Sequence, residues 1–557
     1  MPSPGLSPAA PRVPLAALLL SATVAGALGA QPTVLTIASP EEDARRLAQL
    51  RGHPTAGTLL RDGATLVRAP HDSAPRLTTP DASRRPWWRT WWRTPQQPQW
   101  LLPQLRVVHN SALATSLNEG ALWTGRGTSA LVRAGVAFRQ GMVDVTLVPE
   151  LVASENRPVE VRAGQTPGWS AWSSPWRTSG MPADLPLRFG NAPVRAVSPG
   201  QSRVEVALGA LAVGISTANL WWGPGVRNAL VLGNQADGIP HALLRTTRPL
   251  STALGDFEGR WMAGRLTESL YFDRDPANDH RAMGGMALSW VPRWIPNTTL
   301  GLTSLVVRSM EGGGVTGTAA GGAAAAMRAV LPLGGVSRTD QMQGAFLRWV
   351  FPDDGFEFWG EYASTRLPTL RQWLVAPNAD AGWTLGAQWL LPRPRPTDGS
   401  WRLQLEVTEV AQSRVLEGRA PRDWGTGTAV VQGFTHRGRM LGVSTGPGSS
   451  HWWGAMDRWH PRWSAGAYVA RTRWENDALY RQPTPNPFAH DVSVAGGVRA
   501  SAIAAGWRQQ LVLGVERRFN YQFESGYLAP LGRGQRTVTN LRLELTLAPT
   551  ALRAPHP

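Results

Sequence analysis

Large apolar and polar side chains alternate along many segments of the chain from about residue 104 onward. In the segment Trp401–Thr408 (WRLQLEVT), apolar residues occupy every second position, and charged or polar residues fill the positions between them. Residues 541–547 and 203–208 repeat this pattern. Because successive side chains of a strand point to opposite faces, the alternation predicts strands with one apolar and one polar face.

The nature of the two faces decides the fold class, since alternation alone also fits a soluble β-sandwich. The polar faces carry charges of both signs, and the apolar faces carry large residues. Many of the 27 tryptophans fall near segment ends, among them Trp290, Trp294, Trp349, Trp401, Trp452 and Trp453. A polar lumen, an apolar lipid-facing band and aromatic girdles are typical of outer-membrane barrels. The sequence therefore predicts an all-β fold, a large antiparallel transmembrane β-barrel.

The chain divides into four regions. Residues 1–30 combine one cation, an apolar run and a small-residue stretch, which predicts a signal peptide. Residues 31–103 are expected to form a small helical and irregular element on the periplasmic side. Residues 104–548 have room for about 18 strands of about 9 to 11 residues with their connections, and 549–557 would form a C-terminal tail. We therefore expect an exported protein of the cell outer membrane.

A short helix is predicted within the periplasmic element. Ser39 is a suitable N-cap, Pro40 suits the first helical position, and Gly52 suits the end. Leu47 and Leu50 share one face of this helix, which is too short to be stable without packing on a larger surface.

The charge balance favours anionic partners. The formal net charge is +17, and all 56 basic residues are arginine. Arginine binds carboxylate and phosphate, so acidic polysaccharide, outer-membrane lipid with its lipopolysaccharide, and nucleic acid fit the charge. Export argues against nucleic acid. The absence of lysine indicates a codon habit, so the charge excess is more informative than the identity of the cation. Residues 84–93 (RRPWWRTWWR) suit a membrane-interface belt, a carbohydrate platform or a nucleic-acid patch.

The segment Ser216–His241 gathers the chemistry expected of a sugar site. Pro224 between two glycines forces a sharp bend beside two tryptophans. Paired indoles near planar hydrogen-bonding side chains suit a sugar ring, although tryptophan at a strand end is often a packing residue. The candidate polysaccharide-binding residues are Trp221 and Trp222 for stacking, Arg227, Arg188 and Arg126 for anionic groups, and Asn228, Asn234 and His241 for hydroxyls. The same residues also suit a buried structural role.

Catalysis is not expected. Glu357 and Glu361 face the same side of a strand, but four residues of strand rise by about 13 Å, which exceeds glycosidase carboxylate spacings. Ser216, Asp237 and His241 lack the sharp turn that frames a nucleophilic serine. No cysteine is present, which excludes disulfides and thiolate metal sites, and no cofactor is expected.

Several islands of sequence resemble the Wzi capsule-assembly proteins of Gram-negative outer membranes. The islands fall in order along most of the predicted mature chain and are Asn118–Gly127, Leu185–Gly190, Pro199–Ser202, Trp221–Gly225, Gly264–Ser269, Phe356–Tyr362, Phe434–Gly438 and Gly446–Ser449.

The resemblance implies a barrel of about 18 strands with a small periplasmic helical element. It also implies a non-enzymatic lectin that binds capsular polysaccharide and helps to assemble or anchor it at the cell surface. We further expect a monomer, with the polysaccharide export machinery as a candidate partner. An outer-membrane channel for small solutes or saccharides remains the alternative, since a polar lumen suits both functions.

Overall fold

A computed structural model of the chain describes residues 33–34, 37, 39–52, 59–67, 98–310, 339–365, 370–375, 380–391, 399–412, 422–460, 462–481, 489–523 and 536–549. The predicted signal peptide, the arginine and tryptophan segment 84–93 and all of the predicted tail beyond residue 549 lie outside these ranges.

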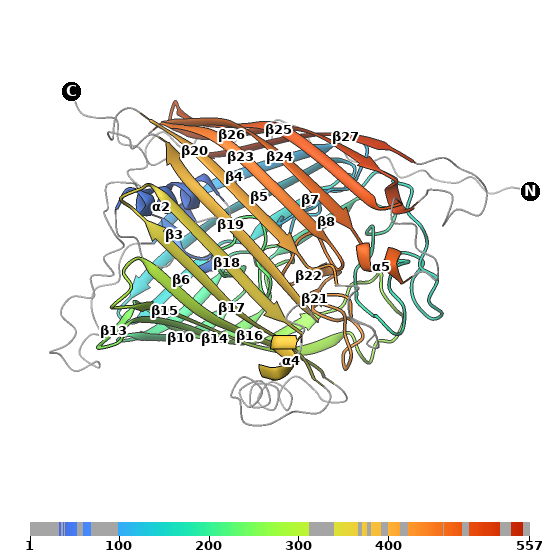
Figure 1. The fold of residues 1–557 in the computed structure, drawn as a ribbon, viewed down its shortest axis with the longest axis horizontal. Coiled ribbons are helices and arrows are strands. Elements are labelled where there is room, and N and C mark those ends of the chain that lie inside the picture. The colour runs from blue at the N-terminus through green and yellow to red at the C-terminus, as the bar shows by residue number, and fades with distance from the viewer. Residues whose placement is uncertain are drawn as a thin grey trace, which may run out of the picture.

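The chain forms one closed antiparallel barrel (Figure 1). Its ring contains 21 strand segments, but three pairs of segments are interrupted single strands: β6 with β7, β8 with β9, and β12 with β13. The barrel therefore has 18 strands, as predicted. The first strand begins at Gln99, five residues before the expected boundary at residue 104, and the last strand ends at Pro549.

The barrel segments are β4 (Gln99–Asn110), β5 (Gly127–Gln140), β6 (Val143–Leu147), β7 (Glu150–Ser154), β8 (Val194–Ser198), β9 (Arg203–Leu208), β10 (Leu211–Ser216), β12 (His241–Thr246), β13 (Leu250–Thr252), β14 (Gly255–Thr267), β15 (His280–Pro292), β16 (Thr298–Ser309), β17 (Thr339–Phe351), β18 (Phe356–Ser364), β19 (Ala381–Leu391), β20 (Ser400–Glu409), β23 (Ser450–His460), β24 (Trp463–Trp474), β25 (Asp491–Ala504), β26 (Trp507–Phe519) and β27 (Val538–Pro549). The remaining elements are β1 (Thr33–Val34), α2 (Pro40–Leu50), β2 (Leu60–Asp62), β3 (Leu66–Val67), β11 (Leu220–Trp222), α4 (Leu370–Val375), β21 (Thr435–His436), β22 (Arg439–Met440), α5 (Asn476–Tyr480) and the 3-10 turn η4 (Tyr521–Phe523).

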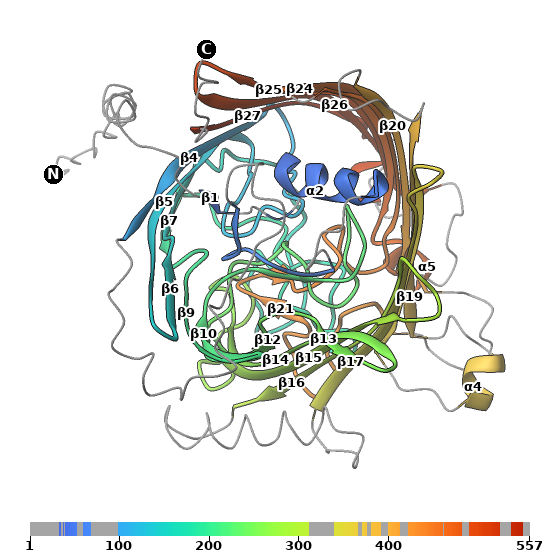
Figure 2. The ribbon, with the colours of Figure 1, turned by 90° about the vertical axis from the view of Figure 1, so that its left-hand side faces the viewer.

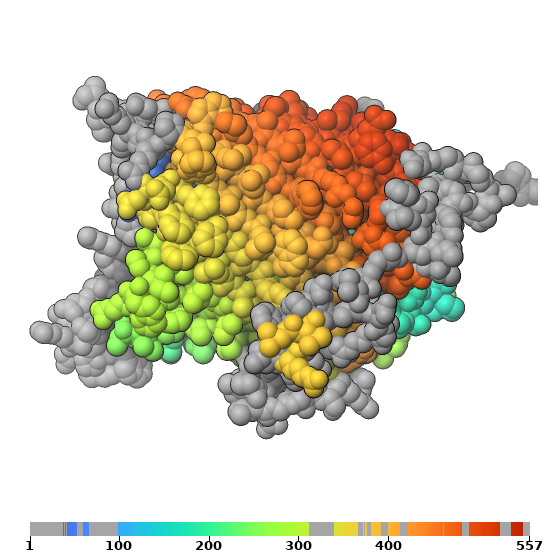
Figure 3. Space-filling view, viewed as in Figure 1, coloured from blue at the N-terminus to red at the C-terminus, as the bar shows by residue number. Residues whose placement is uncertain are grey.

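The outer face of the barrel carries many exposed apolar residues, and exposed and buried positions alternate along strands such as β20. On β16, Leu302 is 60% exposed, whereas Leu305 and Val307 are buried inside. β20 and β23 to β26 are neighbours in the barrel, and the yellow-to-red part of the chain forms a continuous outer wall in the space-filling view (Figure 3). No helix among the described residues is long and apolar enough to cross a bilayer. A closed barrel with an apolar exterior requires a membrane around it, so the outer-membrane location is confirmed.

The two ends of the barrel differ in loop length. Turns such as 460–463 and 504–507 are short at one end, whereas residues 155–193 and 410–449 form long connections at the other. Short turns are typical of the periplasmic side and long loops of the extracellular side. Outward-facing aromatics gather at the short-turn end and include Trp290, Trp294, Trp349, Trp389, Trp401 and Trp463. Trp453, which the sequence placed in a girdle, faces the lumen and is buried.

The periplasmic element lies inside the barrel mouth at the short-turn end (Figure 2). Helix α2 begins at Pro40, and the Ser39 hydroxyl accepts a hydrogen bond from the Glu42 amide, as the capping pattern predicted. Leu47 and Leu50 pack against Val350 and Leu390 of the wall. The helix therefore gains from the barrel the apolar surface that it lacks alone.

Ion pairs join this inner element, which we call the plug (residues 39–52 and 59–67), to the wall. The Arg46 guanidinium pairs with Glu357, which also pairs with Arg348 of the neighbouring strand at 2.8 Å. Asp43 pairs with Arg402 at 3.1 Å. Buried ions of this kind are stable only when each has a partner, so the plug and the wall neutralise each other.

We expect Glu357→Ala to destabilise the folded barrel by about 3–5 kcal/mol, because it leaves two buried guanidiniums without their carboxylate. Urea titration of the protein folded in detergent micelles measures this loss. Glu155→Ala, which removes a 41% exposed carboxylate paired with Arg157, is the matched control and should change the free energy of unfolding by less than about 1 kcal/mol. Equal stabilities of the two variants would contradict the assigned role of the ion pair.

Candidate functional site

The segment between β10 and β12 leaves the wall and enters the lumen, where it meets the plug. Its strand β11 pairs with β2 of the plug, and Trp221 is the register partner of Arg61. The Arg61 guanidinium also donates to the carbonyl oxygens of Gly223 and Gly225, at 3.0 and 2.6 Å. Arg46 donates to the Pro224 carbonyl at 2.6 Å. The sharp bend therefore presents its carbonyl oxygens to the plug.

The amides of the same bend face two carboxylates of the wall. Glu406 accepts hydrogen bonds from the amides of Val226, Arg227 and Asn228 at 2.6 to 2.9 Å. Glu361 accepts from the amides of Gly225 and Leu230 at 2.8 and 3.1 Å.

Gly223 is required at this bend. Its φ is +124°, and a Cβ there would collide with the Glu361 carboxylate. The loop is thus an anion-binding turn whose anions are supplied by the barrel itself.

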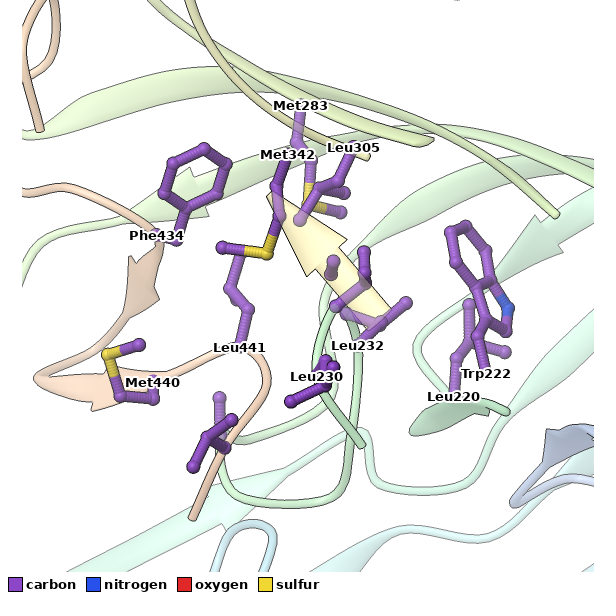
Figure 4. Packing of buried hydrophobic residues seen from close by; sticks show 14 of the residues in the cluster. Leu220, Trp222, Leu230, Leu232, Met283, Leu305, Met342, Phe434, Met440 and Leu441 are labelled. Atoms are coloured by element: carbon purple, nitrogen blue, oxygen red, sulfur yellow. The ribbon is translucent and has the colours of Figure 1, made fainter. Parts of the chain in front are cut away.

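Trp221 and Trp222 are interior residues. Their side chains are 0% and 1% exposed. Trp221 lies under the Arg61 guanidinium, 4.6 Å from the ring centroid. Trp222 packs in the main core cluster with Leu230, Leu232 and Met262 (Figure 4). Neither indole presents a face to solvent, so the structure places both in the packing role rather than on a sugar platform.

The other candidates of this segment are also used inside the protein. Asn228 accepts from the amide and hydroxyl of Ser444 at 3.0 and 2.8 Å. Asn234 donates to the Asn118 carbonyl at 2.9 Å. The His241 ring is hydrogen-bonded to the Ile239 carbonyl oxygen at 2.6 Å.

Arg227 is half-buried and has a lumen-facing neighbour. Its guanidinium lies 5.3 Å from the ring centroid of Trp453. Together with Trp221, Trp222, Asn228, Asn234 and His241 it belongs to the interior, and these six residues do not form an open site.

Arg188 and Arg126 lie in the extracellular loops. Arg188 is buried, donates to the Asn156 carbonyl at 2.7 Å and lies 5.6 Å from the Trp172 ring. Burial lowers the pKa of its guanidinium. Arg126 is exposed and donates to the carbonyl oxygens of Ser111 and Pro158. Arg126 is therefore the one candidate residue of the eight that reaches the surface.

An aromatic cluster in these loops was not singled out from the sequence. Trp123 and Phe189 meet edge to face at 4.8 Å, and Phe189 meets Tyr271 at 5.7 Å. The Arg439 guanidinium lies 5.5 Å from the Trp123 ring. The 155–193 loop that carries Phe189 also contains three half-buried tryptophans, Trp169, Trp172 and Trp176. The close spacing of these tryptophans in the sequence could have indicated an aromatic cluster in this loop.

The residues considered for catalysis have other partners. Glu357 is ion-paired and Glu361 holds the bend, as described above. Ser216 and His241 are register partners on neighbouring strands, but the Ser216 hydroxyl donates to the Ser202 carbonyl. Asp237 pairs with Arg437. These contacts assign structural roles to each group.

A buried pair of carboxyl groups connects three extracellular loops. Asp184 accepts hydrogen bonds from the Ser269 amide and hydroxyl and from the Gly438 amide, at 2.5 to 3.1 Å. Glu268 accepts from the Gln432 side chain. Burial, together with the nearby carboxylates of Asp184 and Asp273, raises the pKa of Glu268 to about 8. Burial also raises the pKa of Asp184.

Comparison with known proteins identifies the fold. No protein-family model and no curated protein matches the sequence. The structure is similar to Wzi of Escherichia coli, described as an outer-membrane protein involved in group 1 capsule assembly and as a carbohydrate-binding β-barrel, with a TM-score of 0.50, 10% identity, and coverage of 80% of this chain and 83% of Wzi. It is also similar to OprD of Pseudomonas aeruginosa, with a TM-score of 0.35, 11% identity, and coverage of 80% and 92%. The predicted resemblance to Wzi is thus confirmed in the fold.

We expect Trp222→Ala to lower the free energy of unfolding by about 3–5 kcal/mol, because a fully buried indole is removed from the core cluster. Heat-dependent migration of the folded protein on gels and surface abundance on cells both report the loss. Trp294→Ala, at an exposed position in the periplasmic girdle, serves as the control. A Trp222→Ala protein of unchanged stability that had lost only sugar binding would instead support the stacking role.

We expect the stability of the extracellular loops to fall as pH rises from about 4.5 to about 8. The folded state keeps the proton on Glu268 up to a pKa of about 8, whereas the unfolded chain releases it near 4.5, so raising the pH across this window favours unfolding. Glu268→Gln should flatten this dependence. Limited proteolysis of both proteins at pH 6 and pH 9 measures it, and an unchanged pH profile in the variant would contradict the assignment.

Proposed function

We propose that this protein is a non-enzymatic lectin of the cell surface that binds acidic polysaccharide, such as a capsule, and helps to assemble or anchor it. The observation that carries the proposal is the filled lumen. Plug, bend and wall are joined by ion pairs and by amide-to-carboxylate bonds. A barrel with this interior has its accessible recognition surface at the extracellular loops.

The loops offer chemistry that suits an acidic polymer. Exposed arginines of these loops are Arg126, Arg157, Arg274, Arg437 and Arg481, and the 155–193 loop also carries half-buried aromatic rings. Guanidinium groups bind carboxylate and phosphate substituents, and aromatic rings pack on the apolar faces of sugars. The description of Wzi as a carbohydrate-binding barrel supports the same assignment.

Two of these arginines provide the sharpest test. Arg126 and Arg274 are exposed and lack a carboxylate partner among the described residues. We expect the double variant Arg126→Gln with Arg274→Gln to bind a fluorescent acidic polysaccharide about fivefold more weakly, with a smaller dependence on salt concentration. Arg293→Gln, at a periplasmic turn, is the charge-matched control. Fluorescence anisotropy in detergent micelles measures the affinity.

Conductance separates this proposal from the channel alternative. The intact protein in planar bilayers is expected to give no steady large currents, because the plug is anchored on opposite sides by the wall. Steady currents together with no measurable binding of acidic or neutral polysaccharide would overturn the lectin proposal and favour a channel. Unchanged binding in the double variant with a normal folded fraction would reject these two residues as contacts.

A further inference from the structure

Several arginines face outward near the extracellular ends of the barrel strands. Besides Arg195 on β8 and Arg473 on β24, they include Arg265 on β14, Arg308 on β16, Arg471 on β24 and Arg517 on β26, each within three residues of the end of its strand. Each has the same parity along its strand as exposed apolar or half-buried outward residues, for example Val469 for Arg471 and Val515 for Arg517. These guanidiniums therefore leave the barrel on its lipid-facing side.

The strand register arranges two of them in a row. Arg471 is the partner of Val494 on β25, and Val494 is the partner of Arg517 on β26. Figure 1 shows the three strands side by side. Neighbouring strands lie about 4.8 Å apart, so the two arginines emerge about 10 Å from each other across one apolar residue. Trp452 lies against Arg471 and Phe519 against Arg517, at 5.6 and 5.4 Å.

The second pair repeats the arrangement on the other side of the barrel. Arg265 is the partner of Ala282 on β15, and Ala282 is the partner of Arg308 on β16. Both arginines are exposed. We call these two sets the arginine rows: Arg471, Val494 and Arg517, and Arg265, Ala282 and Arg308.

The rows carry more positive charge than the chain neutralises. None of the four arginines forms an ion pair with a carboxylate among the described residues. The carboxylate near Arg471 is Glu409, which also interacts with Arg473. The patch around the first row therefore contains three cations, Arg471, Arg473 and Arg517, and one anion. The outward surface at the opposite boundary carries stacked tryptophan and phenylalanine rings, with Arg458 over Trp401.

We propose that each arginine row binds the phosphate groups of a phosphorylated glycolipid in the outer leaflet. A guanidinium at the membrane boundary can bind phosphate while its stem and aromatic neighbour contact acyl chains. The apolar residue between the two arginines suits a lipid rather than a soluble polymer, because it faces the hydrocarbon side of the wall. The inference does not depend on polysaccharide binding by the loops.

Binding of lipid A with two phosphates, compared with binding of its enzymatically dephosphorylated form, distinguishes recognition of phosphate from recognition of the acyl chains alone. We expect bis-phosphorylated lipid A to bind the intact protein in mild detergent, as measured by native mass spectrometry and by a rise in Tm. The double variant Arg471→Gln with Arg517→Gln should bind it about 10- to 30-fold more weakly, and Arg265→Gln with Arg308→Gln similarly. Arg293→Gln, at the periplasmic boundary, should bind as the unmodified protein does. Heat-dependent migration on gels establishes that each variant is folded.

Retained lipid A affinity in both folded double variants would overturn the proposal. Equal binding of dephosphorylated lipid A would also overturn it, because the acyl chains would then suffice. If a soluble acidic polysaccharide competed with lipid A for these four arginines, the rows would be assigned to polymer recognition and the lipid proposal would be overturned. The loop variants test the proposed function separately, because a change in their polysaccharide binding with unchanged lipid A binding says nothing against the lipid site.

Discussion

The fold depends on buried carboxylates that project from the wall into the barrel. Glu357 holds a plug guanidinium, Glu361 and Glu406 hold the amides of the inserted bend, and each would be costly to bury alone. The partners of these carboxylates together are spread over the plug, the bend and neighbouring strands, so the burial of each part depends on charges and amides supplied by the others. The sequence Trp221–Gly225 follows from this requirement, since Gly223 and Pro224 let the backbone approach carboxylate and guanidinium together.

The barrel and its helix were predictable because their signals are local. Alternation over 9 to 10 residues specifies strands such as β18 and β20, and Ser39 with Pro40 specifies the start of α2. The interior placement of Trp221 and Trp222 was not predictable in the same way. A sugar-binding site and a packed lumen contain the same residue types, namely indoles beside amides and guanidiniums. The decisive partners, such as Glu406, lie about 180 positions away in the chain.

The interrupted strands of the wall were also not predictable from the sequence. β6 and β7, like β8 and β9, are short segments that share one strand position, so their alternation is too brief to fix a boundary. The 155–193 loop between them is long and irregular, and Asn156 supports it by donating to three backbone carbonyls of residues 189–192. Such contacts depend on loop geometry, which no periodic pattern encodes.

The arginines separate into three populations according to what neutralises them. Those of the lumen, such as Arg203 and Arg348, are paired with carboxylates of the chain. Some exposed arginines of the loops, such as Arg157 and Arg437, are also paired with carboxylates. Arg126, Arg274 and the four arginines of the arginine rows face the outside without an ion pair among the described residues. In both proposals, the counter-charges of these outer arginines come from the surroundings: lipid phosphate where the side chains meet the leaflet, and acidic polymer where they meet water.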